Sequence, residues 1–311
     1  MWPFKQREPA GKGAGIETSP EVLRKVQRLE VRTRGFVESL FSGEYLSVFH
    51  GRGMEFSHVR GYAPGDDVRA IDWKVTARRG SAYVRQFVEE RDLLVALIVD
   101  VSASGRSGPG ERSAVEVANE IASALAFSAA RNNDRMALIL VSDRVEEVVP
   151  PGSGRKHVIR LLSDLISIHP HGKRTDLTPG LERAARLLQG RATLFVISDF
   201  IQERTPEFRA ALGRCARAHD LIAVRLSSAG TDELPNVGWV EMTDPETGRR
   251  VVIDSGSRRV RAHYRHSVHV AHAEMASILT EAGAELIEVD TSADPLASLA
   301  EFFRRRQRTP R

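Results

Sequence analysis

Three short stretches of the sequence combine serine, threonine and aspartate in a way that suits a small cation site. The first holds Asp100, Ser102 and Ser104 in "DVSASG", directly after the apolar run "LLVALIV". The other two hold Thr175 in "KRTDL" and Asp199 in "ISDF". Hydroxyl and carboxylate oxygens with no nearby histidine or cysteine favour a hard divalent cation such as Mg²⁺. These residues form one site only if the fold brings the three stretches together.

The alternation of apolar and amphipathic segments predicts a fold that brings the three stretches together. Residues 93–100 are apolar on both faces, which is typical of a central strand covered by helices on each side. Further strands are expected at residues 136–142, 192–200, 221–227 and 284–290, with helices between them. This pattern predicts an α/β fold with a doubly wound, mostly parallel sheet. Ligands of such sheets bind beyond the carboxyl ends of the strands, where the strand order reverses.

The whole chain divides into three predicted parts. Residues 1–20 are rich in glycine, proline and lysine and are expected to form a flexible tail. Residues 21–92 are expected to hold a helix, capped by Ser19, and then a partly β module. Residues 93–311 are expected to form the sheet domain. Within it, "VGWVEMTDPETGRRVVIDSG" is expected to be an inserted β-hairpin that turns at "DPETG".

Composition excludes several classes of function. Lys and Arg number 45 against 41 Asp and Glu, and no stripe of basic and aromatic residues is present, so nucleic acid is not an expected partner. The single cysteine, Cys215, excludes an intramolecular disulfide and a cysteine-rich metal cluster. No apolar run approaches the roughly 20 residues of a membrane span, and the amino terminus lacks the apolar core of a signal peptide. We therefore expect a cytoplasmic protein.

The stretch "DVSAS" resembles the D-x-S-x-S motif of the metal-ion-dependent adhesion site in the von Willebrand factor A fold. The resemblance implies that Ser102 and Ser104 bind the metal directly and that Thr175 is the ligand from the second loop. It also implies that Asp100 and Asp199 act directly or through water. The ion would be Mg²⁺ or Mn²⁺, and its open position would accept a Glu or Asp from a client protein.

A second resemblance covers the chain from about Gly43 to the carboxyl terminus. The stretches "GRGMEFSHVRGYAPGDDVRAIDWKVTARRG" and "RQFVEERD", followed by "DVSASG", resemble the domain of unknown function 58 family. Members of that family resemble partners of MoxR-type AAA+ ATPases. The resemblance implies a non-enzymatic, metal-dependent adaptor or co-chaperone that works with such an ATPase in protein remodelling or assembly.

The same strand-end residues also fit two different functions. A Mg²⁺-dependent hydrolase, most plausibly a phosphatase, could use them. Ser102, however, stands where haloacid-dehalogenase phosphatases place the second aspartate of D-x-D, and serine transfers protons poorly near neutral pH. The site could also be idle in a scaffold protein. Asp100, Ser102, Ser104, Thr175, Asp176 and Asp199 could simply cap the helices that follow them.

Three further motifs are expected to have structural roles. Four histidines lie three residues apart on a predicted helix and are expected to form a solvated face: His263, His266, His269 and His272. The stretch "PGSGRKH" lacks the G-K-[ST] ending of a phosphate loop and is expected to be a glycine turn. The stretch "GDDVRAIDW" is expected to form a buried ionic network, with a partner surface as the alternative. The residues concerned are Asp66, Asp67, Arg69, Asp72 and Trp73. The same expectation applies to Glu89 and Glu90.

Overall fold

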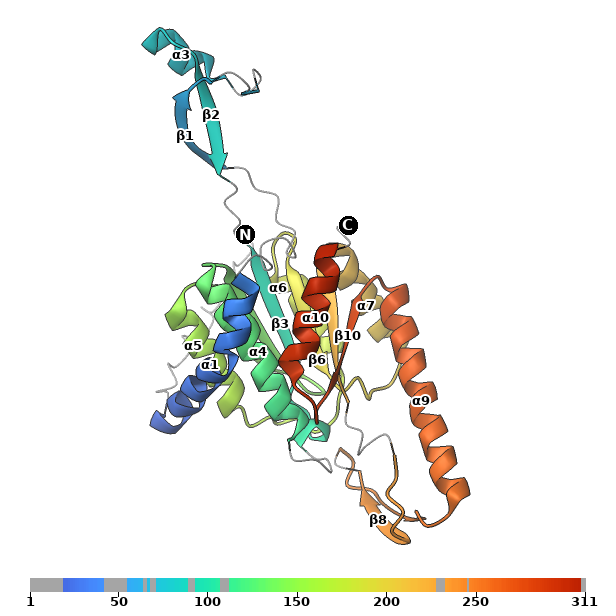
Figure 1. Cartoon of the computed structure of the whole chain (residues 1–311). Coiled ribbons are helices and arrows are strands. Elements are labelled where there is room, and N and C mark those ends of the chain that lie inside the picture. Colours follow the sequence, from blue (N-terminus) through green and yellow to red (C-terminus); the bar gives the residue numbers. More distant parts are fainter. Residues whose placement is uncertain are drawn as a thin grey trace, which may run out of the picture.

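The computed structural model describes residues 19–41, 55–63, 66–67, 71–88, 93–106, 112–227, 233–244 and 246–308. Its centre is a six-stranded sheet, drawn in Figure 1. The strands are β3 (Leu94–Asp100), β4 (Arg135–Val141), β5 (Val145–Gly152), β6 (Thr193–Ser198), β7 (Asp220–Ser227) and β10 (Glu285–Asp290). The predicted tail at residues 1–18 lies outside the described residues, as do Arg69, Glu89 and Glu90.

The strand order β10-β7-β6-β3-β4-β5 makes the sheet doubly wound. The chain starts in the middle at β3, runs out through β4 to β5, and returns to place β6 on the other side of β3. All neighbours are parallel except β4 and β5, which pair antiparallel. The prediction of a doubly wound, mostly parallel sheet is therefore confirmed. The strand order reverses between β3 and β6.

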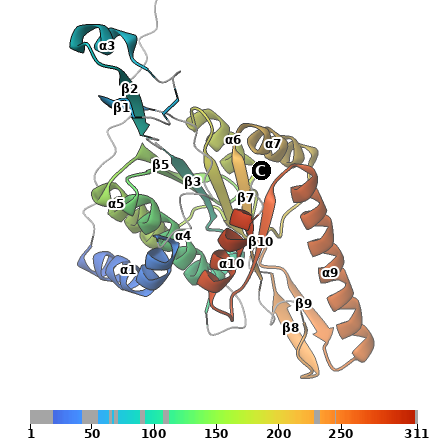
Figure 2. The same ribbon diagram turned by 45° about the horizontal axis from the view of Figure 1, so that its top comes forward.

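Helices cover both faces of the sheet (Figures 1 and 2). One face carries α1 (Pro20–Phe41), α4 (Ala114–Arg131), α5 (Arg155–Ser167) and α10 (Pro295–Arg308). The other carries α6 (Thr178–Leu187), α7 (Pro206–Ala218) and α9 (Arg258–Glu281). The two layers bury two separate apolar cores, so the sheet edge where the strands end is held rigidly from both sides.

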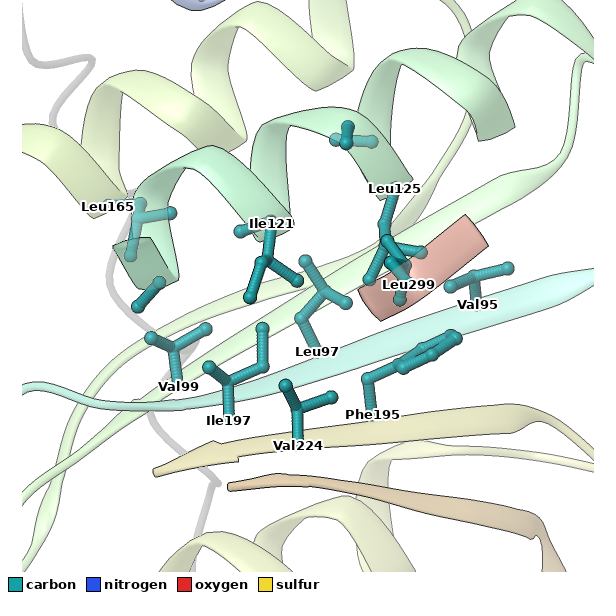
Figure 3. Packing of buried hydrophobic residues seen from close by; sticks show 14 of the residues in the cluster. Val95, Leu97, Val99, Ile121, Leu125, Leu165, Phe195, Ile197, Val224 and Leu299 are labelled. Atoms are coloured by element: carbon teal, nitrogen blue, oxygen red, sulfur yellow. The ribbon is translucent and has the colours of Figure 1, made fainter. Parts of the chain in front are cut away.

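Strand β3 contributes to both cores, which explains its continuous apolar sequence. Val95, Leu97 and Val99 face the α4 side, where Figure 3 shows them against Ile121 and Leu125. Leu94, Ala96 and Ile98 face the α6 side. Burying each large aliphatic side chain contributes about 1.5–3 kcal/mol, so β3 is a fixed base for the residues that follow it.

Helix α1 packs on the sheet domain. Its Val26 and Phe36 belong to the core under α4, and its Glu30 and Arg32 pair with Arg155 and Glu120 at 2.6 and 2.8 Å. Ser19 accepts a hydrogen bond from the Glu21 amide, as expected for the residue before the helix. The division of the chain at residues 20 and 92 remains a prediction.

A small antiparallel hairpin, β1 (Glu55–Gly61) and β2 (Tyr83–Val88), precedes β3 and carries α3 (Trp73–Arg79). In Figures 1 and 2 it projects away from the sheet. The expected buried ionic network is wrong for the described residues of this segment. Asp66 pairs with Arg60 of the same hairpin at 2.7 Å, Asp72 caps α3, and Trp73 is 65% exposed.

The inserted hairpin is confirmed as β8 (Trp239–Thr243) paired antiparallel with β9 (Arg250–Asp254). It forms a two-stranded sheet of its own between β7 and α9 in the chain. In Figure 1 it lies at the end of the molecule opposite the β1–β2 hairpin, below the carboxyl end of β3.

Candidate functional site

The carboxyl ends of β3 and β6 bring the five predicted site residues together. Val99 of β3 pairs with Ile197 of the adjacent strand β6. Asp100 comes one residue after this pair and Asp199 comes two residues after it, so both lie at the same edge of the sheet. Ser102 and Ser104 lie in the loop that leaves β3, where the short 3-10 helix Ser104–Arg106 begins. Thr175 reaches the same place from the loop before α6.

The three hydroxyl oxygens form a triangle. Ser102 Oγ lies 3.0 Å from Ser104 Oγ and 2.9 Å from Thr175 Oγ1, and the third side measures 3.4 Å. Ser102 is 1% exposed and Thr175 is 7% exposed. Two segments 73 residues apart in sequence therefore meet in a buried polar contact.

Each hydroxyl also lies beside a carboxylate. Ser102 hydrogen-bonds Asp100, and Ser104 hydrogen-bonds Asp199. Thr175 donates to Oε1 of Glu246, which lies 2.7 Å away. A hydroxyl has one proton and two lone pairs. When each hydroxyl gives its proton to its carboxylate, only lone pairs face the centre of the triangle.

Burial and mutual repulsion perturb the two buried aspartates. Loss of water raises the pKa of Asp100, although hydrogen bonds from Ser198 and Ser102 oppose the shift. Burial and the negative charge of Asp100 raise the pKa of Asp199 to about 7. Glu246 adds to the repulsion at both groups. A cation at this edge would relieve all of these interactions.

The alternative that these residues cap helices is wrong for most of them. Ser113 caps α4, with its Oγ accepting from the Glu116 amide at 3.3 Å, and Thr205 caps α7. Helix α6 follows Leu177 and has no side-chain cap at that residue. Asp176 is the exception, because its carboxylate accepts from the Thr178 amide at 2.9 Å in the first turn of α6.

Two residues at the site were not among the predicted ligands. Ser198, which precedes Asp199 in "ISDF", donates to Asp100 over 2.7 Å. Its position at a strand end was a usable signal. Glu246 comes from the "DPETG" turn of the β8–β9 hairpin. Nothing in the local sequence indicates that this turn folds back over the sheet edge.

The donor set fits a small hard cation. Octahedral Mg²⁺ holds oxygens at about 2.0–2.1 Å, so adjacent ligands lie about 2.9 Å apart. Two sides of the hydroxyl triangle, 2.9 and 3.0 Å, are close to this spacing, and the third, 3.4 Å, is longer. Hydroxyls that hydrogen-bond each other have a similar spacing, so these distances alone do not indicate a metal. The stronger argument for a cation is the presence of buried carboxylates beside the hydroxyls. Among the described residues, no group of three or more His, Cys, Asp or Glu could hold a metal ion. A metal here would therefore depend on the hydroxyls.

The remaining sequence motifs have ordinary structural roles. The histidine row of α9 lies on the surface, with His263, His266 and His269 exposed. The "PGSGRKH" stretch turns at Gly154, which has a φ of 85° and precedes α5 without a side-chain cap. Both predictions of a structural role are confirmed.

The strand order defines a doubly wound, mostly parallel α/β protein. The family described as "Protein of unknown function DUF58" matches residues 58–274. The chain belongs to this family, as its sequence motifs predicted.

Relatives and solved structures extend the comparison. The uncharacterized protein Rv1480 of Mycobacterium tuberculosis is 29% identical over 93% of this chain and 91% of its own length. The "Uncharacterized protein in moxR 3'region" of Paracoccus denitrificans is 35% identical over 33% of this chain and 96% of its own. BatB of Bacteroides thetaiotaomicron is 14% identical over 70% of this chain and all of its own, with a TM-score of 0.46. The von Willebrand factor type A protein of Catenulispora acidiphila is 14% identical over 72% of this chain and 43% of its own, with a TM-score of 0.40.

None of the described helices combines the length and the apolar character that crossing a membrane requires.

Proposed function

We propose that the chain is a divalent-metal-dependent protein-binding module. The observation that carries the proposal is the hydroxyl triangle of Ser102, Ser104 and Thr175, in which every hydroxyl lies beside its own carboxylate. Mg²⁺ or Mn²⁺ would be held by the three hydroxyls, with Asp100 and Asp199 balancing its charge. The ion would supply a strong, directional contact for an acidic side chain of a partner protein.

We further propose that the site binds without catalysis. Ser102 occupies the position at which a proton-transferring aspartate would be needed for phosphatase chemistry. The aspartates at the edge are fixed by hydrogen bonds from the protein: Asp100 accepts from the Ser102 amide at 2.9 Å, and Asp199 accepts from the Ile201 amide at 2.9 Å. Such groups suit a rigid docking point.

A MoxR-type AAA+ ATPase is the proposed partner. A family relative from Paracoccus denitrificans carries the name "Uncharacterized protein in moxR 3'region", which supports a functional link between the two kinds of protein. Under this proposal the chain would act as an adaptor or co-chaperone, joining the ATPase to a client protein through the metal.

Calorimetric titration of the metal-stripped full chain with Mg²⁺ and then Mn²⁺ tests the metal site. We expect one-site binding in the wild type, and its loss in Ser102→Ala and Asp100→Ala. Ser153→Ala is the matched control, because Ser153 is exposed in the turn before α5. Equal heats in all four proteins, or no heat in any, would contradict the proposal.

The partner is tested by co-purification with a MoxR-type ATPase from the same genome. Chelating the metal would also empty the nucleotide site of the ATPase, so the comparison is made at constant Mg²⁺. We expect Ser153→Ala to retain the ATPase and Ser102→Ala to lose it. If both variants retained the ATPase, binding of the ATPase would not depend on the metal site.

A further inference from the structure

The turn of the β8–β9 hairpin covers the hydroxyl triangle. Glu246 at this turn accepts the Thr175 proton at 2.7 Å, across 71 residues of sequence. Its negative charge also contributes to raising the pKa of both Asp100 and Asp199. Glu246 is therefore a third carboxylate of the site, and the one that does not come from the sheet edge.

The turn is organised to present this carboxylate. Asp244 accepts hydrogen bonds from the Glu246 amide at 2.9 Å and from the Thr247 hydroxyl. The Gly248 amide closes the turn on the Asp244 carbonyl at 2.8 Å. These bonds hold the pKa of Asp244 below its usual range, and the positive charge of Arg174 contributes. Arg174 precedes Thr175 in the chain, so its charge and the Thr175 hydroxyl both act on the turn from the same loop.

Two of the three hydroxyl residues of the triangle are buried, and Ser104 is half-buried. Ser102 and Thr175 are almost fully buried although they lie at the edge of the sheet. A carboxylate from solvent that takes the place of Glu246 beside Thr175 requires the turn to move. That movement exposes little apolar surface, because hairpin side chains such as Trp239 and Val252 are already 74% and 61% exposed.

The base of the hairpin can stay in place while its tip moves. Ser255 is fully buried and bonds the Gly238 carbonyl through its amide at 2.8 Å and its hydroxyl at 2.7 Å. Arg261 donates to the Ser255 and Gly256 carbonyls at 2.6 and 2.8 Å. The hairpin is thus anchored at one end and held at the other by the Glu246 contact.

We infer that Glu246 is an internal acidic ligand that closes the site, and that an acidic segment of a partner protein binds by displacing the hairpin turn. This inference rests on the metal-dependent docking function proposed above. The partner's apparent affinity is then lowered by the fraction of molecules that are open. Weakening the Glu246 contact raises that fraction.

A labelled synthetic peptide of residues 239–254 serves as the acidic probe, with fluorescence anisotropy as the readout in Mg²⁺. We expect the full chain carrying Glu246→Gln to bind it about tenfold more tightly than the wild type, as for a site that is open one-tenth of the time. Glu241→Gln is the matched control, since Glu241 lies on the same hairpin and pairs with the exposed Arg250. A peptide with Gln in place of Glu246 should not bind.

Hydrogen exchange at Thr247, Gly248 and Arg249 gives a second readout. We expect faster exchange in Glu246→Gln and no change in Glu241→Gln. If Mg²⁺ binds but Glu246→Gln alters neither exchange nor peptide affinity, or never binds the peptide, the inference is wrong and the metal site stands. If no variant binds Mg²⁺, the proposed function fails, and the inference fails with it.

Discussion

Ser198 donates its hydroxyl proton to Asp100 over 2.7 Å, joining the ends of two adjacent strands at the point where the strand order reverses. Ser198 is 2% exposed, and its oxygen also accepts from the Phe200 amide at 2.9 Å. The other carboxylate oxygen of Asp100 accepts from the Ser102 amide. One oxygen of Asp100 is therefore oriented by a side chain of β6 and the other by its own loop, so the geometry of Asp100 depends on the pairing of β3 with β6.

The buried aspartates predict how stability depends on pH in the metal-free protein. The pKa of Asp199 is about 7 in the fold and 3.8 in the reference state, so the folded protein binds more protons between these values. The contribution of Asp199 to stability should therefore fall as pH rises from about 4 to about 7, and level off above that. The slope that this one group contributes is at most about 1.4 kcal/mol per pH unit, the free energy of binding one proton. Urea unfolding of EDTA-treated protein at pH 5, 6, 7 and 8 measures the effect.

Asp199→Asn provides the comparison for that experiment, since asparagine keeps an oxygen for the Ile201 amide. The wild type should lose stability relative to this variant as pH rises through the same window. Saturating Mg²⁺ should reduce the pH dependence of the wild type, because the bound cation favours the ionised carboxylate. A wild type that gains stability relative to Asp199→Asn would contradict the assignment.

Close packing around Gly172 is expected to fix the position of the loop that carries Thr175. A Cβ at this residue would collide with the Ser142 hydroxyl and the Asp143 carboxylate. The Gly172 amide also donates to Glu146 at 2.7 Å, so the loop cannot simply move outward. We expect Gly172→Ala to cost about 1–3 kcal/mol of stability and to weaken Mg²⁺ binding, measured by urea unfolding and calorimetry.

Gly35→Ala is the matched control for this substitution. Gly35 lies inside α1, and a Cβ there would meet nothing within 4 Å. Alanine should therefore stabilise the protein by about 0.5–1 kcal/mol and leave Mg²⁺ affinity unchanged. Unchanged Mg²⁺ binding in Gly172→Ala would show that Thr175 is not positioned through this loop.

Glu120 predicts how strongly α1 is held on the sheet domain. Its carboxylate is 2% exposed and pairs with Arg32 of α1 at 2.8 Å and with Arg112. Replacing both arginines by methionine leaves a buried charge without a counter-ion, and should cost about 3–5 kcal/mol. Glu120→Gln should cost much less, because Arg32 remains 54% exposed and reaches water. Equal losses of unfolding free energy in the two proteins would contradict this account.

The sequence was sufficient for the main elements of the six-stranded sheet and for most of the side chains gathered at its edge. Strand β3 was predictable because its residues face two cores, and parallel strands place their carboxyl ends at one edge. That geometry brings Asp100 and Asp199 together whatever the loops do. The error at Asp66–Trp73 arose because a charged stretch beside a tryptophan suggests burial, whereas Asp66 finds its partner, Arg60, within its own hairpin.

By itself, the sequence determined which strand ends carry hydroxyl and carboxylate side chains, because side-chain chemistry and the apolar pattern of a strand are both local. Only the tertiary structure decided which further residues meet those side chains. The "DPETG" turn has the same local form wherever its hairpin points. Its contact with Thr175 depends on how the Gly238–Ser255 base is anchored against α9, a set of hydrogen bonds between segments distant in sequence. That placement turns an ordinary hairpin turn into the third carboxylate of the site.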